Sequence, residues 1–196
     1  MLRGIIHSLR KIKFIKIASD ILFMFVFELI GNRLISHIPI SMLRKNFYKY
    51  ILRVKILDNA YILNGCYIYP DLNDLVIGMN TIVNQDVILD RRANLYIGNN
   101  VNISREVAIY TGGHEIDSTT FAYYGKSVVI KDYVWIGTRA MIMPGVTIGE
   151  GAVILPGAVV IHECEAYTVY GGIPAKKIRM RSKNLEYELK WQTYFL

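Results

Sequence analysis

The chain has 196 residues and a hydrophobic content of 53%, which is enough for one domain with a sizeable core. Its formal net charge of +7 is unevenly distributed along the chain. Residues 1–55 hold eleven basic and two acidic side chains, residues 56–175 hold six and twelve, and residues 176–196 hold six and two. An acidic middle with basic ends excludes an ordinary nucleic-acid binder, which presents a basic face with interleaved aromatic residues.

Residues 1–53 predict a helical region that begins with a basic segment. A helix is expected from about Ile17 to Ile30, with Ser19 or Asp20 as its N-cap and Gly31 as its C-cap. The apolar centre of this helix is too short to cross a bilayer, which takes about 20 residues. No small-residue cleavage site follows it, so a secretory signal is a poor interpretation.

A second helix is predicted from about Ser41 to Arg53. It has an apolar stripe and an opposite basic side, formed respectively by Leu43, Phe47, Tyr50 and Ile51 and by Arg44, Lys45 and Lys49. Two interpretations of the N-terminal helices stay open, and both can hold. The helices either cover the open end of the fold that follows, or they form a basic amphipathic element on an anionic membrane surface.

Aliphatic residues then recur at every sixth position. The main ladder is Ile56, Ile62, Ile68, Ile77, Val83, Leu89, Ile97, Ile103, Ile109, Ile130, Ile136, Ile142, Ile148, Ile154 and Val160. A second, mostly smaller ladder stands two residues earlier at Val54, Ala60, Cys66, Leu75, Thr81, Val87, Leu95, Val101, Val107, Val128, Val134, Ala140, Val146, Ala152 and Ala158. Neither the helix period nor simple strand alternation gives this repeat. It indicates a β-solenoid, in which each repeat completes its core against its neighbours.

Extra residues enter only after every third hexapeptide, which predicts a coil with three flat faces. Five coils are complete, and Ala166, with Cys164 two residues before it, is expected to begin a sixth. Cys66 and Cys164 are both assigned to the small ladder, so packing explains them and a reducing cytoplasm is the expected compartment. Beyond Lys183 a helix is expected, in which Leu185, Leu189 and the aromatic residues of 191–195 fold back on the solenoid or on a neighbour.

Four Ile-Gly pairs, Ile77-Gly78, Ile97-Gly98, Ile136-Gly137 and Ile148-Gly149, resemble the bacterial hexapeptide-repeat signature of left-handed parallel β-helix acyltransferases. The resemblance extends over about residues 54–181. It implies a mainly β fold, a left-handed parallel β-helix of five to six triangular coils with N-terminal helices and a short C-terminal helix. The expected division is a helical cap at 1–53, the acyltransferase domain at 54–181 and a helical tail at 182–196.

The longest corner insertion runs from Tyr110 to Lys126 and contains His114. A long loop in an economical fold is usually functional, and a neutral imidazole can accept a proton from a hydroxyl group. A carboxylate or a backbone carbonyl should fix the tautomer of this histidine, and Glu115, Asp117 and Asp86 are the candidate carboxylates.

The His-x-x-Asp-Ser segment that begins at His114, followed by Val134-Trp135-Ile136-Gly137, resembles the active-site segment of maltose, galactoside and colanic-acid O-acetyltransferases. The resemblance implies that His114 is a general base in acetyl transfer from acetyl-CoA, with Asp117 and Trp135 beside the acceptor. It also implies acceptor contacts at Asn84 and Asp90, with Asp86 where the family has a second asparagine. These corner residues can alternatively be simple turn formers.

The resemblance further places the pantetheine arm of acetyl-CoA in a groove between two subunits of a homotrimer. The expected cofactor residues are Trp135, Thr138, Gly157, Ala158, Gly172, Lys176, Lys177 and Arg179. The three basic residues suit the phosphates of CoA, although a basic run can also be an ordinary solvated face.

Three other functions compete with saccharide O-acetylation. N-acetylation of an amino sugar needs the same apparatus. A metalloenzyme of the γ-carbonic-anhydrase type needs three histidine ligands, whereas the repeats hold only His114 and His162, so no metal is expected. A solenoid that binds ice or a partner would display regular outward threonine rows, which this sequence lacks. The expected location is the cytoplasm, with peripheral contact at the inner membrane face left open.

Overall fold

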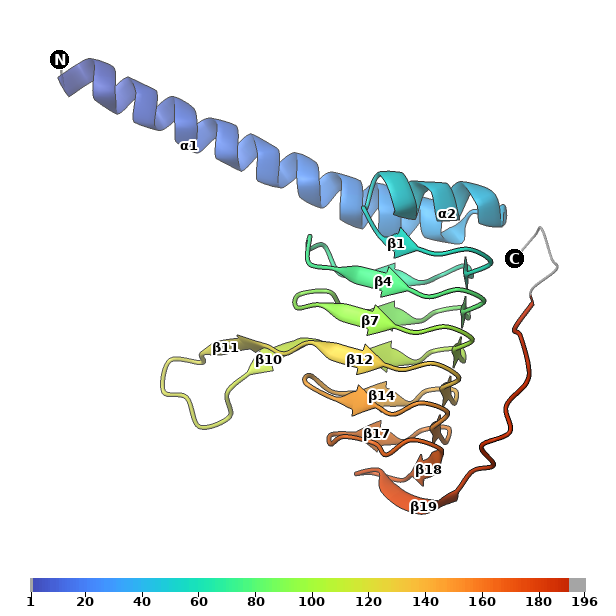
Figure 1. Ribbon diagram of the computed structural model, residues 1–196. Helices are drawn as coiled ribbons and strands as arrows, with labels where there is room; N and C mark the ends of the chain where they lie inside the picture. Colours follow the sequence, from blue (N-terminus) through green and yellow to red (C-terminus); the bar gives the residue numbers. More distant parts are fainter. Residues whose placement is uncertain (1, 191–196) are drawn as a thin grey trace.

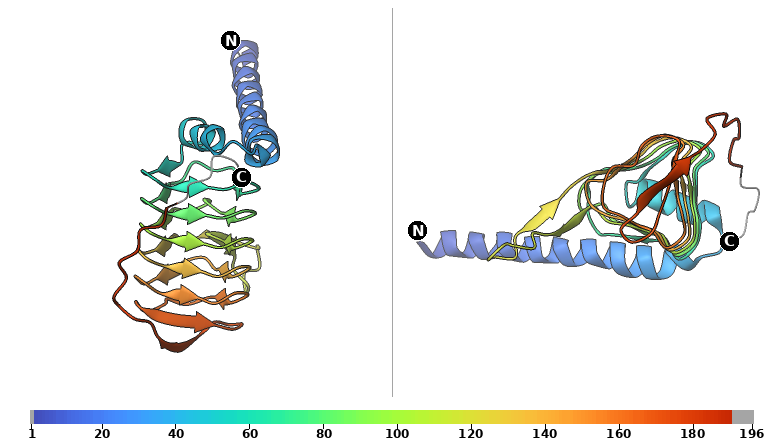
Figure 2. Two further views of the ribbon diagram at one scale, coloured as in Figure 1. Left: turned by 90° about the vertical axis from the view of Figure 1, so that its right-hand side faces the viewer. Right: turned by 90° about the horizontal axis from the view of Figure 1, so that it is seen from below.

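The computed structural model of the chain describes residues 2–190, and the side chains of residues 13–190. Most of the chain is a parallel β-solenoid whose coils stack below two N-terminal helices (Figure 1). Viewed along the stack, the coil has a triangular outline (Figure 2), which is consistent with the expected left-handed β-helix. The predicted fold class is therefore confirmed.

Three parallel sheets form the three faces of the solenoid. The first face contains β1 (Lys55–Ile56), β4 (Leu75–Ile77), β7 (Leu95–Ile97), β12 (Val128–Ile130) and β15 (Thr147–Ile148). The second face contains β2 (Tyr61–Ile62), β5 (Ile82–Val83), β8 (Asn102–Ile103), β13 (Trp135–Ile136), β16 (Val153–Ile154), β18 (Thr168–Gly171) and the antiparallel β19 (Lys176–Met180). The third face contains β3 (Tyr67–Ile68), β6 (Ile88–Leu89), β9 (Ala108–Ile109), β14 (Met141–Ile142) and β17 (Val159–Val160).

The six-residue repeat sets the register of all three faces. On the first face Ile77 pairs with Ile56 and Ile97, and Ile130 pairs with Ile97 and Ile148. Every member of both ladders is buried. Burial of one such aliphatic side chain contributes roughly 1.5–3 kcal/mol, so the stacked ladders form the core of the domain.

The sixth coil begins earlier than expected. Cys164, not Ala166, pairs with Ile148 and so takes the main-ladder position, while Ala166 is exposed. The corner after β17 is therefore shorter than a hexapeptide step, because the chain turns directly from Val160 into the last coil. Both cysteines are free and buried, and burial raises the pKa of each thiol to about 12.

The N-terminal helices are longer than the sequence predicts. The segments are α1 (Leu2–Met24), the π-helical η1 (Phe25–Leu34), the 3-10 turn η2 (Ile35–His37) and α2 (Ser41–Tyr50). The predicted N-cap at Ser19 or Asp20 and C-cap at Gly31 are wrong, because helical hydrogen bonding continues through all three positions. Gly31 is instead a packing position, since a Cβ there would lie 3.4 Å from side-chain atoms of Phe47 and Leu52.

The second helix buries a different face from the predicted one. Leu43, Tyr50 and Ile51 are exposed, whereas Arg44 and Tyr48 are completely buried. The reason is the open edge of the first coil, where strand carbonyls lack a neighbouring strand. The Arg44 guanidinium donates to the carbonyl groups of Ile38 and Ile62. The side of the helix that faces the coil therefore contains this arginine, where an apolar stripe was expected.

The helices cap this open edge, as one of the two interpretations predicts. The side-chain amide of Asn32 in η1 pairs with the backbone of Ile68, donating to its carbonyl and accepting from its N–H, both at 2.9 Å. The carbonyl of Ser36 accepts the N–H of Gly65 at 2.8 Å. These contacts replace the missing strand and satisfy buried backbone groups.

The predicted C-terminal helix is wrong for residues 183–190, which run in extended conformation back along the second face (Figure 1). Leu185, Tyr187 and Leu189 are partly buried while the residues between them are exposed, a strand-like alternation that is already present in the sequence. The Tyr187 hydroxyl donates to the carbonyl of Tyr133, so the expected return to the solenoid does occur. The predicted aromatic contacts of 191–195 lie outside the described residues.

Candidate active site

The long corner insertion folds as a two-stranded ribbon that projects from the end of the third face (Figure 1). Its strands are β10 (Gly112–His114) and β11 (Tyr123–Gly125), with His114 paired to Tyr123. A Cβ on Gly112 would lie 2.5 Å from the Tyr123 hydroxyl, and a Cβ on Gly113 would lie 2.9 Å from that of Tyr124. The two glycines therefore let the tyrosine side chains lie across the ribbon.

The imidazole of His114 is held by backbone and aromatic contacts. Its Nδ1 lies 2.8 Å from the carbonyl oxygen of Phe121, and its ring stacks on that of Phe121 with centroids 3.8 Å apart. The Tyr123 ring meets it edge-on at 5.8 Å. A carbonyl can only accept, so Nδ1 carries the proton, and in the neutral ring Nε2 is then the proton acceptor. The arrangement presents a proton acceptor on an exposed ribbon.

Of the expected partners for this histidine, the backbone carbonyl is the one observed. Glu115 and Asp117 are exposed and make no hydrogen bond to His114, and Asp86 lies at a different corner. Within one chain, none of the three carboxylates is therefore the partner of His114. The residue that matters, Phe121, lies seven positions further along the chain, and only the fold of the ribbon brings its carbonyl to the ring.

Asp90 sits at the root of the ribbon and is completely buried. Its carboxylate accepts the backbone N–H groups of Thr111 at 3.0 Å and Gly112 at 3.2 Å, and it pairs with the Arg92 guanidinium at 2.8 Å. Burial alone would raise the pKa of Asp90, but the hydrogen bonds from Arg92 and Thr111 outweigh burial and leave this pKa lowered. Asp90 was expected to contact the acceptor. Within a single chain, it instead holds the backbone at the start of the ribbon.

Asp90 and Arg92 together form a clamp at the root of the ribbon. The sequence pattern did not lead to a prediction of this role for Arg92. Its guanidinium also donates to the carbonyl of Gly112 and lies over the ring of Tyr69 at 4.6 Å and, more distantly, over that of Tyr123 at 6.0 Å. A signal was available, because a buried corner carboxylate needs a cationic partner and the chain reads Asp90-Arg91-Arg92. Arg91 does not pair with Asp90, because its guanidinium donates to the carbonyls of Leu52 and Asn73.

Asn84 and Asp86 are not brought to His114 within one chain. They lie at the corner before β6, whereas Asp90 and the ribbon lie at the corner after the third face. Asn84 donates to the carbonyl of Ile103 at 2.8 Å, and Asp86 has a positive φ of 61° and pairs with Arg105 at 3.3 Å. These contacts fit turn and stacking roles, so any acceptor role for the two residues needs a neighbouring chain.

Trp135 and Thr138 also lie away from the ribbon, on the second face and the corner after it. The Trp135 side chain is 44% exposed, and its indole N–H donates to the Ser104 hydroxyl at 3.2 Å. A cavity of about 250 Å³ lies between this face and the C-terminal tail, lined by Asn102, Trp135, Arg181, Tyr187 and Leu189. The tail therefore forms one wall beside Trp135, which the sequence did not suggest.

The expected cofactor glycines differ in their accessibility. Gly157 is exposed with a φ of +71°, and a Cβ placed on it would meet nothing within 4 Å, so a ligand could approach its backbone. Gly172 makes the turn into β19 with a φ of +96°. Ala158, by contrast, is a core residue with a fully buried side chain, and its N–H and carbonyl are bonded to Leu155 and Met141. The side chain of Ala158 therefore faces the core, and its expected role beside the cofactor stays a prediction.

The expected phosphate-binding side chains lie on β19, whose residues are all exposed. This strand joins the sheet that also contains Trp135, so one face carries the expected thioester end and the expected phosphate end. Lys177 already pairs with Glu165 at 2.6 Å, and that hydrogen bond raises the pKa of Lys177. Lys176 has no ion pair with any described residue, and Arg179 bonds only a backbone carbonyl. The last two residues are therefore free to meet an anion.

Within residues 2–190 no group of three or more His, Cys, Asp or Glu side chains is placed to hold a metal ion. In the same part of the chain, no helix combines the length and hydropathy that a membrane span needs.

The repeats are similar to those of known transferases. The family model described as bacterial transferase hexapeptide (six repeats) matches residues 127–162. A proposed acetyltransferase of Saccharomyces cerevisiae is 40% identical over 110 residues, which are 55% of this chain and 56% of that relative. The chain thus spans little more than half the length of this curated relative.

Solved structures show the same fold. A galactoside acetyltransferase in complex with coenzyme A has a TM-score of 0.69 and 25% identity, with 89% of this chain and 88% of that chain covered. A maltose O-acetyltransferase from Clostridium difficile has a TM-score of 0.63 and 28% identity, covering 85% and 91%. A hexapeptide-repeat acetyltransferase from Vibrio cholerae, complexed with acetyl-CoA, has a TM-score of 0.65 and 27% identity, covering 71% and 77%. Of these three, the galactoside acetyltransferase holds coenzyme A and the Vibrio cholerae acetyltransferase holds acetyl-CoA.

Proposed function

We propose that the protein transfers an acetyl group from acetyl-CoA to a hydroxyl group of a saccharide, with His114 as the general base. The observation that carries the proposal is the hydrogen bond between His114 Nδ1 and the carbonyl of Phe121, which leaves Nε2 as a proton acceptor on an exposed ribbon. The similarity to structures of acetyltransferases that hold acetyl-CoA or coenzyme A supports the cofactor.

The chemistry requires one base and no covalent enzyme intermediate. The acceptor oxygen attacks the thioester carbonyl carbon, the hydroxyl proton passes to Nε2 of His114, and a C–O bond forms. Collapse of the tetrahedral intermediate breaks the C–S bond, and the departing thiolate takes up that proton to leave as the thiol of CoA. A positioned base contributes about 10²–10⁴ to such a rate.

Two similar structures whose names contain a sugar favour a hydroxyl acceptor over an amine. The galactoside and maltose acetyltransferases are 25% and 28% identical to this chain. An N-acyltransferase from Bacillus cereus is only 19% identical and so supports the fold alone. N-acetylation of an amino sugar is the second candidate, because a neutral amine could attack the same thioester.

The proposed site is shared between subunits of a homotrimer. His114 lies on the ribbon after the third face and Trp135 on the second face, so a single chain does not assemble them. Around a three-fold axis, the ribbon of one subunit would reach the second face of the next, with Trp135, Thr138 and Gly157 along the pantetheine arm. Lys176, Lys177 and Arg179 would then meet the CoA phosphates.

The test is acetyl transfer from labelled acetyl-CoA to a panel of free sugars, nucleotide sugars, polysaccharide fragments and matching amino sugars. The proposal expects labelled O-acetyl esters, which mild base cleaves, and loss of the label in His114→Ala. Base-stable amides as the main product would replace the hydroxyl acceptor with an amine. Absence of transfer to every acceptor, with acetyl-CoA bound, would contradict the saccharide as substrate.

A further inference from the structure

The N-terminal end of the molecule exposes much of its apolar surface. Among the described side chains, fourteen of the twenty-six large exposed hydrophobic ones lie within residues 14–51. On α1 alone, Phe14 is 72% exposed and Ile21 is 64% exposed. A soluble protein seldom keeps so large an apolar patch unless something binds there. In Figure 1, α1 projects away from the solenoid, so its outer part is not covered by the rest of the described chain.

The exposed part of α1 is two-sided. At about 100° per residue, one arc of about 160° contains only apolar side chains, and the opposite arc is polar. The apolar arc is formed by Phe14, Ile15, Ile17, Ala18, Ile21 and Leu22, and the polar arc by Lys13, Lys16 and Asp20. Phe23 falls on the polar side but packs against the core where the helix meets the solenoid. The helix therefore has the form of an interfacial amphipathic helix rather than a core helix.

Either a second copy of the chain or a lipid surface could cover the apolar arc, and charge distinguishes these two partners. Residues 1–55 carry eleven basic and two acidic side chains, whereas residues 56–175 carry six basic and twelve acidic ones. A second copy docked at this end would bring like charges together, which is unfavourable. A surface of anionic lipid would attract the basic end and repel the acidic solenoid.

We propose that α1 lies in the headgroup region of an anionic lipid membrane, with its apolar arc inserted between the lipids. Lys13 and Lys16 then face the phosphate groups, and the solenoid stands off the surface. This site is independent of the acetyl-transfer chemistry.

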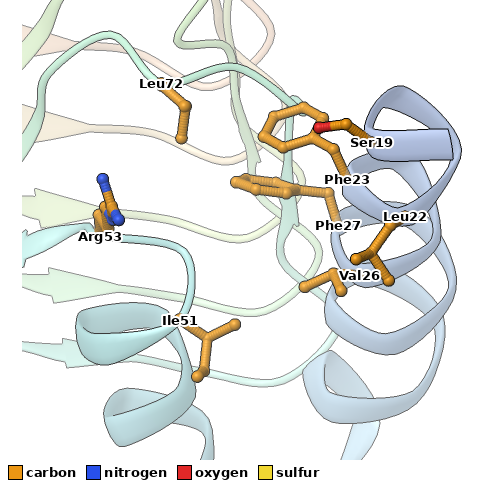
Figure 3. Close-up of a pocket in the computed structure, with 8 residues that line it drawn as sticks. All are labelled: Ser19, Leu22, Phe23, Val26, Phe27, Ile51, Arg53 and Leu72. Atoms are coloured by element: carbon orange, nitrogen blue, oxygen red, sulfur yellow. The ribbon is translucent and has the colours of Figure 1, made fainter. Parts of the chain in front are cut away.

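A cavity beside the helix gives one lipid a defined place. It has a volume of about 300 Å³ and lies where α1 and η1 meet the first coil (Figure 3). Its apolar lining is Leu22, Phe23, Val26, Phe27, Ile51 and Leu72, with Ser19 and Arg53 as the polar members. Leu22 belongs to both the cavity and the inserted arc. Arg53 is exposed and has no hydrogen bond or ion pair with a described residue, so it can meet a lipid phosphate while acyl carbons fill the cavity.

The experiment is flotation of the full chain with vesicles of phosphatidylcholine, alone or mixed with phosphatidylglycerol. We expect flotation only with the anionic vesicles and release at high salt. Lys13→Glu with Lys16→Glu should weaken binding by at least about 25-fold, since each basic residue near the surface contributes about fivefold. Ile17→Glu with Ile21→Glu should abolish flotation, and Arg53→Ala should weaken it about fivefold.

Matched controls separate this site from net charge and general hydrophobicity. Lys131→Glu with Lys183→Glu makes the same charge change on the solenoid and tail, and Ile173→Glu alters a side chain that is 76% exposed in the turn between β18 and β19, at the opposite end of the solenoid. Both should bind as the wild type does. Equal loss in the charge control, or wild-type flotation of the Lys13 and Lys16 variant, would overturn the proposal. Dissociation of an oligomer by Ile17→Glu with Ile21→Glu, measured without vesicles, would assign the arc to another chain.

The orientation has a consequence that rests on the proposed function. The helix and the His114 ribbon project from the same side of the solenoid (Figures 1 and 2), so bound α1 brings the ribbon's side to the membrane. Transfer to a galactosyl lipid in anionic vesicles should then exceed transfer to the free galactoside, and the Lys13 and Lys16 variant should lose this preference alone. Transfer to neither would count against the proposed function, whereas equal transfer to both would count only against this consequence.

Discussion

Phe121 holds His114 twice, through its carbonyl oxygen 2.8 Å from Nδ1 and through its ring, which is stacked at 3.8 Å between centroids. Phe121 itself has a positive φ of 51°, which is uncommon and unfavourable for an aromatic residue. That backbone conformation accompanies the hydrogen bond that fixes the tautomer. The loop therefore accepts local strain at the residue that orients the proposed base.

Replacement of the base should separate chemistry from binding. His114→Ala should lower turnover by about 10²–10⁴ while leaving acetyl-CoA affinity and the melting temperature unchanged, because the exposed ribbon adds nothing to the ladders. Steady-state kinetics, calorimetric titration with acetyl-CoA and thermal unfolding check these three statements. Glu115→Ala is the matched control, and it should retain activity. Unchanged turnover in His114→Ala would show that the base lies elsewhere.

Removal of the stacked ring should have a smaller effect. Phe121→Ala keeps the carbonyl but loses a contact of about 0.5–1.5 kcal/mol, so we expect kcat to fall between about twofold and tenfold. Phe121→Gly, which tolerates a positive φ, should recover stability without recovering the rate. A loss as large as that of His114→Ala would mean that the ring positions substrate as well.

The clamp at the root of the ribbon predicts a pH dependence of stability. The pKa of Asp90 is lowered in the folded state, so its contribution is present above its unfolded pKa of about 3.9 and disappears as pH falls through the lower folded value. Asp90→Asn should cost roughly 2–3 kcal/mol at neutral pH and little in strong acid. Urea unfolding from neutral pH down to acid would show this convergence, and a constant difference would contradict it.

The proposed CoA end should affect the Michaelis constant alone. Lys176→Ala with Arg179→Ala should raise KM for acetyl-CoA and spare kcat at saturation. Lys177→Ala should have a weaker effect, because Lys177 is already paired with Glu165. Initial rates against acetyl-CoA concentration test both statements. A fall in kcat as large as that of His114→Ala would contradict the separate assignment of His114 to proton transfer and of Lys176 and Arg179 to CoA binding.

Mixed assemblies test whether the site is shared. Neither His114→Ala nor Trp135→Ala subunits should be active alone, but refolding equal amounts together should restore up to about a quarter of the sites, since each site takes one residue from each neighbour. Sedimentation should show a trimer. A fully active monomer, or mixtures that never exceed their separate components, would place the whole site in one chain.

The coil architecture could be predicted because its signal is local and repeated. Each hexapeptide specifies which side chains face inward, and stacking reproduces that choice in every coil, as the pairing of Ile77 with Ile56 and Ile97 shows. The one failure in the ladders, at Cys164, occurs where the last coil has no further repeat to fix its register. The ribbon was also predictable as an insertion, although its two strands were not.

The faces of the helices and the partners of the polar groups were decided by tertiary structure. Burial of Arg44, the pairing of Asn32 with Ile68, and the support of Gly112 by Asp90 all join residues that lie far apart in sequence. The sequence by itself determined the six-residue repeat, the three-sided coil and the single histidine in the longest loop, because these depend on neighbours along the chain. Only the tertiary structure decided what satisfies an open strand edge, a buried carboxylate or an imidazole N–H, because desolvated polar groups must find partners wherever the stacked coils bring them.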